Sequence, residues 1–90
     1  MAALAFVYIV RCADGTFYTG WSSDVVKRIA QHNAGHGGRY TRLRRPVILV
    51  YTEELPDRGA AMRREIAIKS YSRERKERLI ATCDQSSRPT

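Results

Sequence analysis

The chain has 90 residues and carries 16 lysines and arginines against 9 aspartates and glutamates, a formal charge of +7. A chain of this length forms one small domain with one modest core, which excludes a second catalytic lobe or a separate recognition domain. Cationic side chains neutralise phosphates and release their counterions, so the charge favours a nucleic-acid partner. A basic surface that serves only solubility is the alternative interpretation.

Neither membrane insertion nor a disulfide framework is expected. Cys12 and Cys83 match no metal-binding spacing and no disulfide pattern, so we expect free thiols in a reducing cytosol. The apolar residues 1–10 lack a basic leader and are too few to cross a bilayer. We therefore predict a cytoplasmic protein without a membrane partner. Residues 1–83 should form the domain, and the polar residues 84–90 a disordered tail.

The chain from residue 6 to residue 21 predicts a β-hairpin. Two runs rich in aromatic and β-branched residues, 6–10 and 17–19, read as strands. They flank Asp14-Gly15, a strong short-range hairpin signal. The functional argument depends on this hairpin.

The register of the hairpin decides whether Tyr8 and Tyr18 share one face of the sheet. A two-residue turn would place them on opposite faces. A three-residue loop with Gly15 as a left-handed bulge would pair Tyr18 with Val10. Tyr8 would then face Gly20, which leaves space across from the tyrosine ring, and both hydroxyls would project from one face. We predict this second register, although a single strand tyrosine can also be an ordinary core residue.

A first helix should follow, capped within residues 22–24 and ended at residues 33–35. Arg28 and His32 share a helical stripe with aliphatic residues. Burying such polar groups costs free energy unless they are paired, so an active site at the helix–sheet edge would explain them. The alternative is that both lie in solvent. The core-facing residues would then be four aliphatics: Val25, Val26, Ile29 and Ala30.

Residues 35–46 form a glycine-rich and strongly basic loop. Glycines let a backbone approach a ligand closely, and interleaved arginine and tyrosine side chains can grip phosphates and stack on bases. Because no mononucleotide-binding pattern such as a Walker lysine is present, we predict contact with a nucleic-acid backbone and no nucleotide cofactor. A mobile surface loop is the alternative. The candidate nucleic-acid-binding residues are Arg39, Tyr40, Arg42, Arg44 and Arg45.

A third strand is predicted at residues 47–52, where a near-continuous aliphatic run is typical of a strand covered on both faces. Asp57 can cap a second helix. Ser72 can cap a third helix, from Arg73 to about Thr82. The chain therefore contains three predicted strands and three predicted helices.

Glu65 interrupts the apolar stripe of the second predicted helix, between Ala61 and Ile68. A carboxylate at this position could bind a metal ion or pair with a buried arginine such as Arg28. A boundary glutamate that pairs with Lys69 through an i, i+4 contact is the third interpretation.

The chain presents one family's motif residues in order: Phe6-Val7-Tyr8, Tyr18-Thr19-Gly20, Arg28 and His32 in one helix, and Glu65 in a later helix. It resembles the GIY-YIG nuclease superfamily, and most closely the small stand-alone bacterial members related to the UvrC and Slx-type endonuclease domains. The resemblance extends from residue 6 to about residue 80. It implies an α+β fold, with a three-stranded antiparallel sheet flanked by three helices and an active site on one sheet face.

The resemblance also implies a role for each motif residue. The catalytic residues would be Tyr8, Tyr18, Arg28 and His32; Glu65 would hold one Mg²⁺ or Mn²⁺ ion; Gly20 closes the second motif. The implied activity is metal-dependent endonuclease cleavage of DNA, with a role in repair or recombination. The sequence departs from the family at Phe6-Val7 and Thr19, and it has no asparagine after Asn33, where many family nucleases carry one.

The same residues suit phosphodiester hydrolysis on chemical grounds. A tyrosine could accept the proton of the attacking water, although the sequence leaves open which one. Arg28 could clamp the non-bridging oxygens, and Glu65 could hold an ion that keeps several waters. A domain this small offers little surface for sequence readout, so selectivity for branched or flapped DNA would come from DNA shape or from a protein partner. The alternative function is a nucleic-acid-binding module without catalysis.

Overall fold

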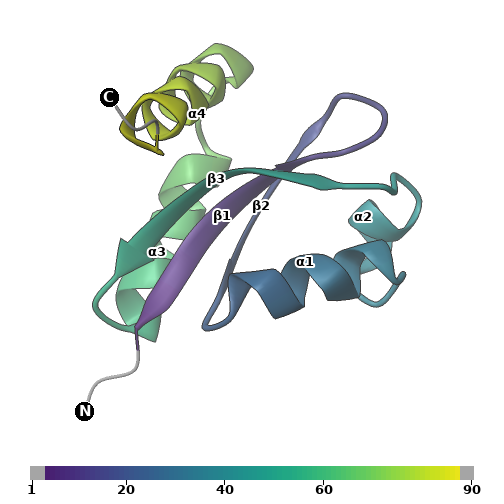
Figure 1. Ribbon diagram of the computed structural model, residues 1–90. Helices are drawn as coiled ribbons and strands as arrows, with labels where there is room; N and C mark the ends of the chain where they lie inside the picture. The colour runs from purple at the N-terminus through teal and green to yellow at the C-terminus, as the bar shows by residue number, and fades with distance from the viewer. Residues whose placement is uncertain (1–3, 88–90) are drawn as a thin grey trace.

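The computed structural model describes residues 4–87, with side chains from Leu4 to Thr82. Its elements are β1 (Ala5–Arg11), β2 (Phe17–Ser22), α1 (Val25–Asn33), α2 (Arg39–Arg42), β3 (Ile48–Leu55), α3 (Arg58–Lys69) and α4 (Arg73–Ser87). The strands form one antiparallel sheet in the order β2-β1-β3 (Figure 1). The predicted α+β fold with a three-stranded antiparallel sheet is confirmed.

The hairpin of β1 and β2 closes through a three-residue loop, in which Gly15 has a left-handed φ of +86°. Tyr8 lies opposite Gly20, and Tyr18 lies opposite Val10. The predicted register is therefore confirmed. Because side chains alternate along a strand, both tyrosines project from the same face of the sheet.

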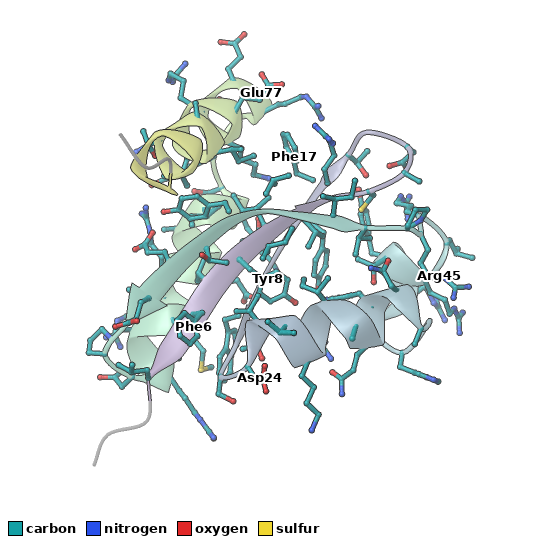
Figure 2. All side chains as sticks on the ribbon, viewed as in Figure 1. Phe6, Tyr8, Phe17, Asp24, Arg45 and Glu77 are labelled. Atoms are coloured by element: carbon teal, nitrogen blue, oxygen red, sulfur yellow. The ribbon has the colours of Figure 1, made fainter. Side chains whose placement is uncertain are left out.

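Helices cover both faces of the sheet (Figure 1). On one face, α3 packs against β1 and β2 and α4 against β3, around a buried cluster: Ala5, Val7, Ile9, Tyr51, Ala61 and Ile68. The opposite face carries α1 and a smaller cluster: Tyr8, Val10, Cys12 and Val47. Figure 2 shows Tyr8 between the sheet and α1, and Phe17 on the side of α4. The hairpin tyrosines thus belong to the face that α1 covers.

The three longer helices begin where the sequence predicted capping side chains. Asp24, Asp57 and Ser72 each accept an N–H from the residue three positions later, at 3.1, 2.8 and 3.2 Å. These contacts satisfy amide donors that have no partner inside a helix. None of the described helices is long and apolar enough to span a membrane.

Helix α4 extends further than predicted. It was expected to end near Thr82 but runs to Ser87, because no glycine or proline interrupts the chain before Pro89. Residues 84–87, which we expected in a disordered tail, are therefore helical. Residues 88–90 of that expected tail lie outside the described part of the chain.

Strand β3 differs from the prediction in both extent and environment. It covers Ile48–Leu55 and is an edge strand beside β1. The prediction that both its faces are covered was wrong, because Ile48 is 55% exposed and Leu49 is 39% exposed. Ile48 and Leu49 are successive residues whose side chains point to opposite faces, so the start of β3 is exposed on both faces.

The loop between α1 and β3 is more ordered than the sequence suggested. Residues 39–42 form the single-turn helix α2, a fourth helix in addition to the three predicted. Asn33 ties the two ends of the loop together, since its amide donates to the Val47 carbonyl (3.1 Å) and accepts the Val47 N–H (2.7 Å). The loop is thus held against the face that carries the hairpin tyrosines.

Candidate active site

Tyr8 and His32 form a buried pair between β1 and α1. The Tyr8 hydroxyl lies 2.8 Å from His32 Nε2, and the two residues are 1% and 0% exposed. Burial raises the pKa of Tyr8 and lowers the pKa of His32, because a low-dielectric environment disfavours the charged form of each group. The pair is therefore uncharged near neutral pH.

The second nitrogen of His32 is held by Thr41, which α2 carries. His32 Nδ1 lies 2.7 Å from Thr41 Oγ1, and Thr41 is 0% exposed. Both ring nitrogens of His32 are thus engaged inside the protein. This position overturns the alternative in which His32 lies in solvent.

Two glycines make room for the pair. A Cβ on Gly20 would lie 2.5 Å from the Tyr8 hydroxyl oxygen. A Cβ on Gly37 would lie 2.6 Å from the His32 Cα and would also overlap its ring. Real Cβ atoms do not approach other atoms this closely, so both positions require glycine.

Arg28 lies half-buried at the entrance to the pair. Its guanidinium donates to the Gln31 side chain (3.3 Å) and to the Gly37 carbonyl (3.2 Å). Burial dominates the raised pKa of Tyr8, and the nearby Arg28 guanidinium opposes that rise. The same charge adds to burial in lowering the pKa of His32. Arg28 therefore acts on both members of the pair.

The inward face of α1 is the stripe that contains Arg28 and His32. Val25 and Ile29 pack beside them against the sheet. Val26 is 82% exposed, which also contradicts the alternative in which it faces the core. A buried polar cluster therefore lies where an aliphatic helix face would place only hydrocarbon.

Tyr18 lies next to the pair and makes two aromatic contacts. Its ring meets His32 edge-on, with 5.4 Å between centroids, and stacks on Tyr40 with 5.8 Å between centroids. The Arg44 guanidinium lies over the Tyr40 ring at 3.9 Å from the centroid. Tyr40, which α2 carries, thus adds a partly exposed aromatic ring to the site next to Tyr18.

The four candidate arginines of the loop divide into two groups. Arg44 pairs with Asp14 (3.1 Å), and Arg45 donates to the carbonyl of Arg42 (2.9 Å). Arg39 and Arg42 have exposed side chains that form no ion pair with any residue in the described range 4–82. Arg39 and Arg42 are therefore better placed to contact phosphates than the other two arginines, which already have partners within the protein.

Glu65 reaches the site from α3, on the other side of the sheet. Its carboxylate forms an ion pair with Lys69 (3.9 Å), and the Lys69 ammonium lies 5.8 Å from the centroid of the Tyr18 ring. Its charge also adds, less than burial does, to the raised pKa of Tyr8. The contact with Lys69 that the sequence allowed is present, and no hydrogen bond joins Glu65 to Arg28 in the described chain. Side chains from both faces therefore meet around β2.

Glu65 offers one carboxylate to a divalent ion. Across the described side chains, no three His, Cys, Asp or Glu residues cluster as a multidentate metal site. Mg²⁺ commonly takes only one or two carboxylates and keeps several of its waters. Glu65 is partly buried and its charge is felt at Tyr8, so a single carboxylate of this kind matches that requirement.

Comparison with known proteins identifies the arrangement. The family model described as the GIY-YIG catalytic domain matches residues 4–78. The chain belongs to the GIY-YIG family. The GIY-YIG match includes every residue of the site described above, from Tyr8 on β1 to Lys69 on α3.

The chain is also similar to several small proteins of about its own length. A UPF0213 protein of Natronomonas pharaonis is 54% identical over 81 residues, which cover 90% of this chain and 95% of that protein. A UPF0213 protein of Staphylococcus aureus is 52% identical over 75 residues, 83% of this chain and 92% of that protein.

Two solution NMR structures share the fold. A UPF0213 protein from Bacillus halodurans is 44% identical with a TM-score of 0.57, and the match covers 88% of this chain and 84% of that chain. A protein from E. faecalis is 34% identical with a TM-score of 0.61, covering 97% of this chain and 93% of that chain. The chain therefore belongs to the GIY-YIG family and is similar to small UPF0213 proteins.

Sequence reasoning missed two residues of the site, Gly37 and Thr41. The doubled glycine at 37–38 was a usable signal, because adjacent glycines in a basic loop suggest a close approach to another group. Thr41 gave no such signal. Its role depends on a single-turn helix that only tertiary contacts define.

Proposed function

We propose that the protein is a metal-dependent endonuclease that hydrolyses phosphodiester bonds in DNA. The observation that carries this proposal is the hydrogen-bonded pair Tyr8–His32, with Tyr18, Arg28 and Glu65 gathered around it. A site of this kind offers a proton acceptor, a fixed cation and a metal-binding carboxylate in one place. Membership in the GIY-YIG family supports a nuclease reaction and a nucleic-acid substrate.

Tyr8 is the better candidate for the general base, because a proton acceptor stands 2.8 Å from its hydroxyl. A phenol is a stronger acid than the Thr41 hydroxyl, so we infer that Tyr8 donates to His32 Nε2 and that His32 Nδ1–H donates to Thr41. In the reaction, Tyr8 takes a proton from water and passes its own to His32. The water oxygen attacks phosphorus, and the bond from phosphorus to the leaving sugar oxygen breaks.

Arg28 supplies the positive charge that the transition state needs. A guanidinium can donate two parallel hydrogen bonds to phosphate oxygens, which bind more tightly as negative charge builds on them. It now donates to neutral acceptors, the Gln31 side chain and the Gly37 carbonyl, and can exchange them for a phosphate. Tyr18 borders the same space and can orient that phosphate through its hydroxyl.

Glu65 would hold the Mg²⁺ or Mn²⁺ ion, of which one suffices. When bound, such an ion stabilises negative charge on the leaving oxygen. The ion pair with Lys69 orients the carboxylate in the absence of substrate. The distance between the Lys69 ammonium and the Glu65 carboxylate is long for an ion pair, 3.9 Å. A divalent metal ion, which is a harder cation, can therefore replace Lys69 at the carboxylate.

The loop beside the site would guide the DNA backbone. Arg39 and Arg42 are exposed, and Tyr40 stacks on Tyr18 at the rim. Such contacts position a strand without reading its bases, so we propose selectivity for branched or flapped DNA, as in repair or recombination. A protein partner could add targeting.

Cleavage of labelled flapped, branched and single-stranded DNA in Mg²⁺ or Mn²⁺ tests this proposal. We expect the wild-type protein to cut at least one substrate and EDTA to stop it. Glu65→Gln should lose cutting while retaining the fold, whereas Glu54→Gln, on the exposed part of β3, should cut normally. If the wild type binds these DNAs without cutting and Glu65→Gln binds equally well, the protein is a binding module instead.

A further inference from the structure

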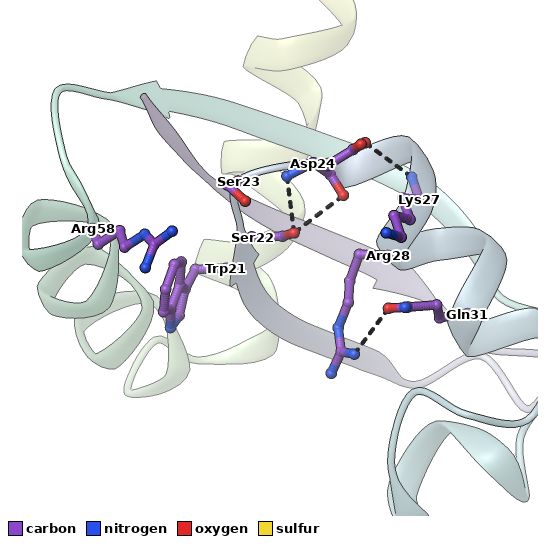
Figure 3. Close-up of a pocket in the computed structure, with 8 residues that line it drawn as sticks. All are labelled: Trp21, Ser22, Ser23, Asp24, Lys27, Arg28, Gln31 and Arg58. Carbon is purple, nitrogen blue, oxygen red and sulfur yellow. Dashed lines mark hydrogen bonds between the residues drawn. The ribbon is translucent and has the colours of Figure 1, made fainter. Parts of the chain in front are cut away.

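A cleft of about 680 Å³ opens beside Arg28, along the edge strand β2 and between α1 and the start of α3 (Figure 3). Trp21 and Arg58 lie together on one side of it. Lys27, Arg28 and Gln31 line the other side. Its volume is within the range of about 300–1,000 Å³ that small-ligand sites occupy.

The cleft is strongly cationic. It has three basic side chains, and its one acidic lining residue is Asp24. The Asp24 carboxylate already accepts the Lys27 backbone N–H at 3.1 Å as the cap of α1. The three cations and one carboxylate give the cleft lining a net formal charge of +2, which favours a phosphate.

The cleft also has a fixed aromatic wall. Trp21 is half-buried and packs against the core cluster on the α3 side of the sheet, so the indole is held in place. Proteins bind single strands by combining cations along the backbone with aromatic rings on which bases stack. In a continuous duplex the base faces are covered by neighbouring bases, so a duplex could use only the cations.

We propose that this cleft binds one unpaired nucleotide of the substrate strand, with its base against Trp21 and its phosphate between Lys27 and Arg58. Arg28 belongs to both the cleft and the Tyr8–His32 site, so a nucleotide held here presents the adjoining phosphodiester to that site. The inference rests on the proposed nuclease function and names its substrate feature. The protein would select DNA with a flap or a splayed arm beside the bond to be cut.

Trp21 is the single tryptophan of the chain, so its fluorescence reports directly on the cleft. The experiment titrates the wild-type protein in EDTA with three probes: single-stranded oligothymidylate, a flapped duplex, and a blunt duplex of equal length. EDTA prevents cutting, which makes the measurement independent of catalysis. We expect the single strand and the flap to quench the fluorescence, and the blunt duplex to bind with little quenching.

Variants of the cleft cations provide the second measurement. Lys27→Ala and Arg58→Ala should each weaken flap binding severalfold and lower the slope of log affinity against log salt by about one. Arg78→Ala removes an equally exposed arginine from α4, away from the cleft, and should preserve flap binding. Trp21→Phe should keep the preference for the flap, whereas Trp21→Leu should bind flap and duplex equally.

The outcomes separate this inference from the proposed function. Equal quenching by flap and blunt duplex, or DNA binding in which Arg58→Ala behaves as Arg78→Ala does, would overturn the cleft assignment. The nuclease proposal would then still stand or fall on the cleavage assay. If none of the probes binds in EDTA, the cleft assignment is wrong, and cutting in Mg²⁺ or Mn²⁺ alone decides the proposed function.

Discussion

The Tyr8 hydroxyl and His32 Nε2 lie 2.8 Å apart, although the two residues are 24 positions apart and belong to a strand and a helix. This contact lies where α1 packs on the sheet, and Thr41 extends it into the loop after α1. The proposed proton relay and the packing of this face therefore use the same atoms. Substitutions here should affect both activity and stability, and matched controls can separate the two.

Removing either end of the proton relay should slow cleavage. Tyr8→Phe and His32→Gln should each lower the single-turnover rate by about 10²–10⁴-fold, the range that general acid–base catalysis supplies. Because the two side chains act as a unit, the double variant should lose no more than either single variant. Tyr71→Phe, outside the site, should cut at the wild-type rate. Losses that multiply in the double variant would mean that the residues act separately.

A side chain at position 20 should displace the Tyr8 hydroxyl. Gly20→Ala places a Cβ 2.5 Å from that oxygen, so we expect lost cleavage and a destabilisation of about 1–3 kcal/mol, typical of overpacking. Gly59→Ala on α3 is the control. Its Cβ would meet only side-chain atoms, and alanine in a helix should add about 0.5–1 kcal/mol to stability. Urea denaturation measures both changes, and equal effects would contradict the assignment.

Two buried threonines should respond oppositely to the same substitution. Thr41→Val leaves His32 Nδ1 buried without a partner and should cost about 1–3 kcal/mol of unfolding free energy. Thr19 is the control, because its hydroxyl is buried with no hydrogen-bond partner in the described chain. Thr19→Val removes that unsatisfied group and should be neutral or stabilising. Equal losses in the two variants would show that the Thr41 contact contributes nothing.

His32 should make stability depend on pH below neutrality. Burial lowers its folded-state pKa below the ordinary value of 6.5, so the unfolded chain binds the proton more readily. The contribution of His32 to stability is therefore full at pH values above 6.5 and falls as the pH drops below 6.5. Urea unfolding at pH 7.5 and pH 5 should show a smaller difference in His32→Gln than in the wild type. His36→Gln, at an exposed site, should retain the wild-type difference.

The hairpin and the helix starts were predictable because their causes are local. Asp14-Gly15 marks the turn and leaves two possible registers, and the choice of a three-residue loop then fixes, by alternation, that Gly20 faces Tyr8. Asp24 and Asp57 cap helices through their own side chains. Such signals need no knowledge of the rest of the fold.

Other features depended on tertiary context. The aliphatic run at Ile48 and Leu49 suggested burial, but β3 is an edge strand and its first two residues stay exposed on opposite faces. Thr41 acquired its role from an α2 turn that no local signal specified. The proximity of Glu65 to Tyr8 depends on how α3 packs against β1 and β2. A single sequence does not specify that packing.

The candidate site draws on both layers of the fold: Arg28 and His32 come from α1 on one face, and Glu65 comes from α3 on the other. A DNA strand that contacts both helices would link the two layers of the fold across the edge of the sheet. Any ligand that binds only the folded chain raises its melting temperature by mass action. A melting-temperature screen could therefore rank DNA architectures as partners without a cleavage signal.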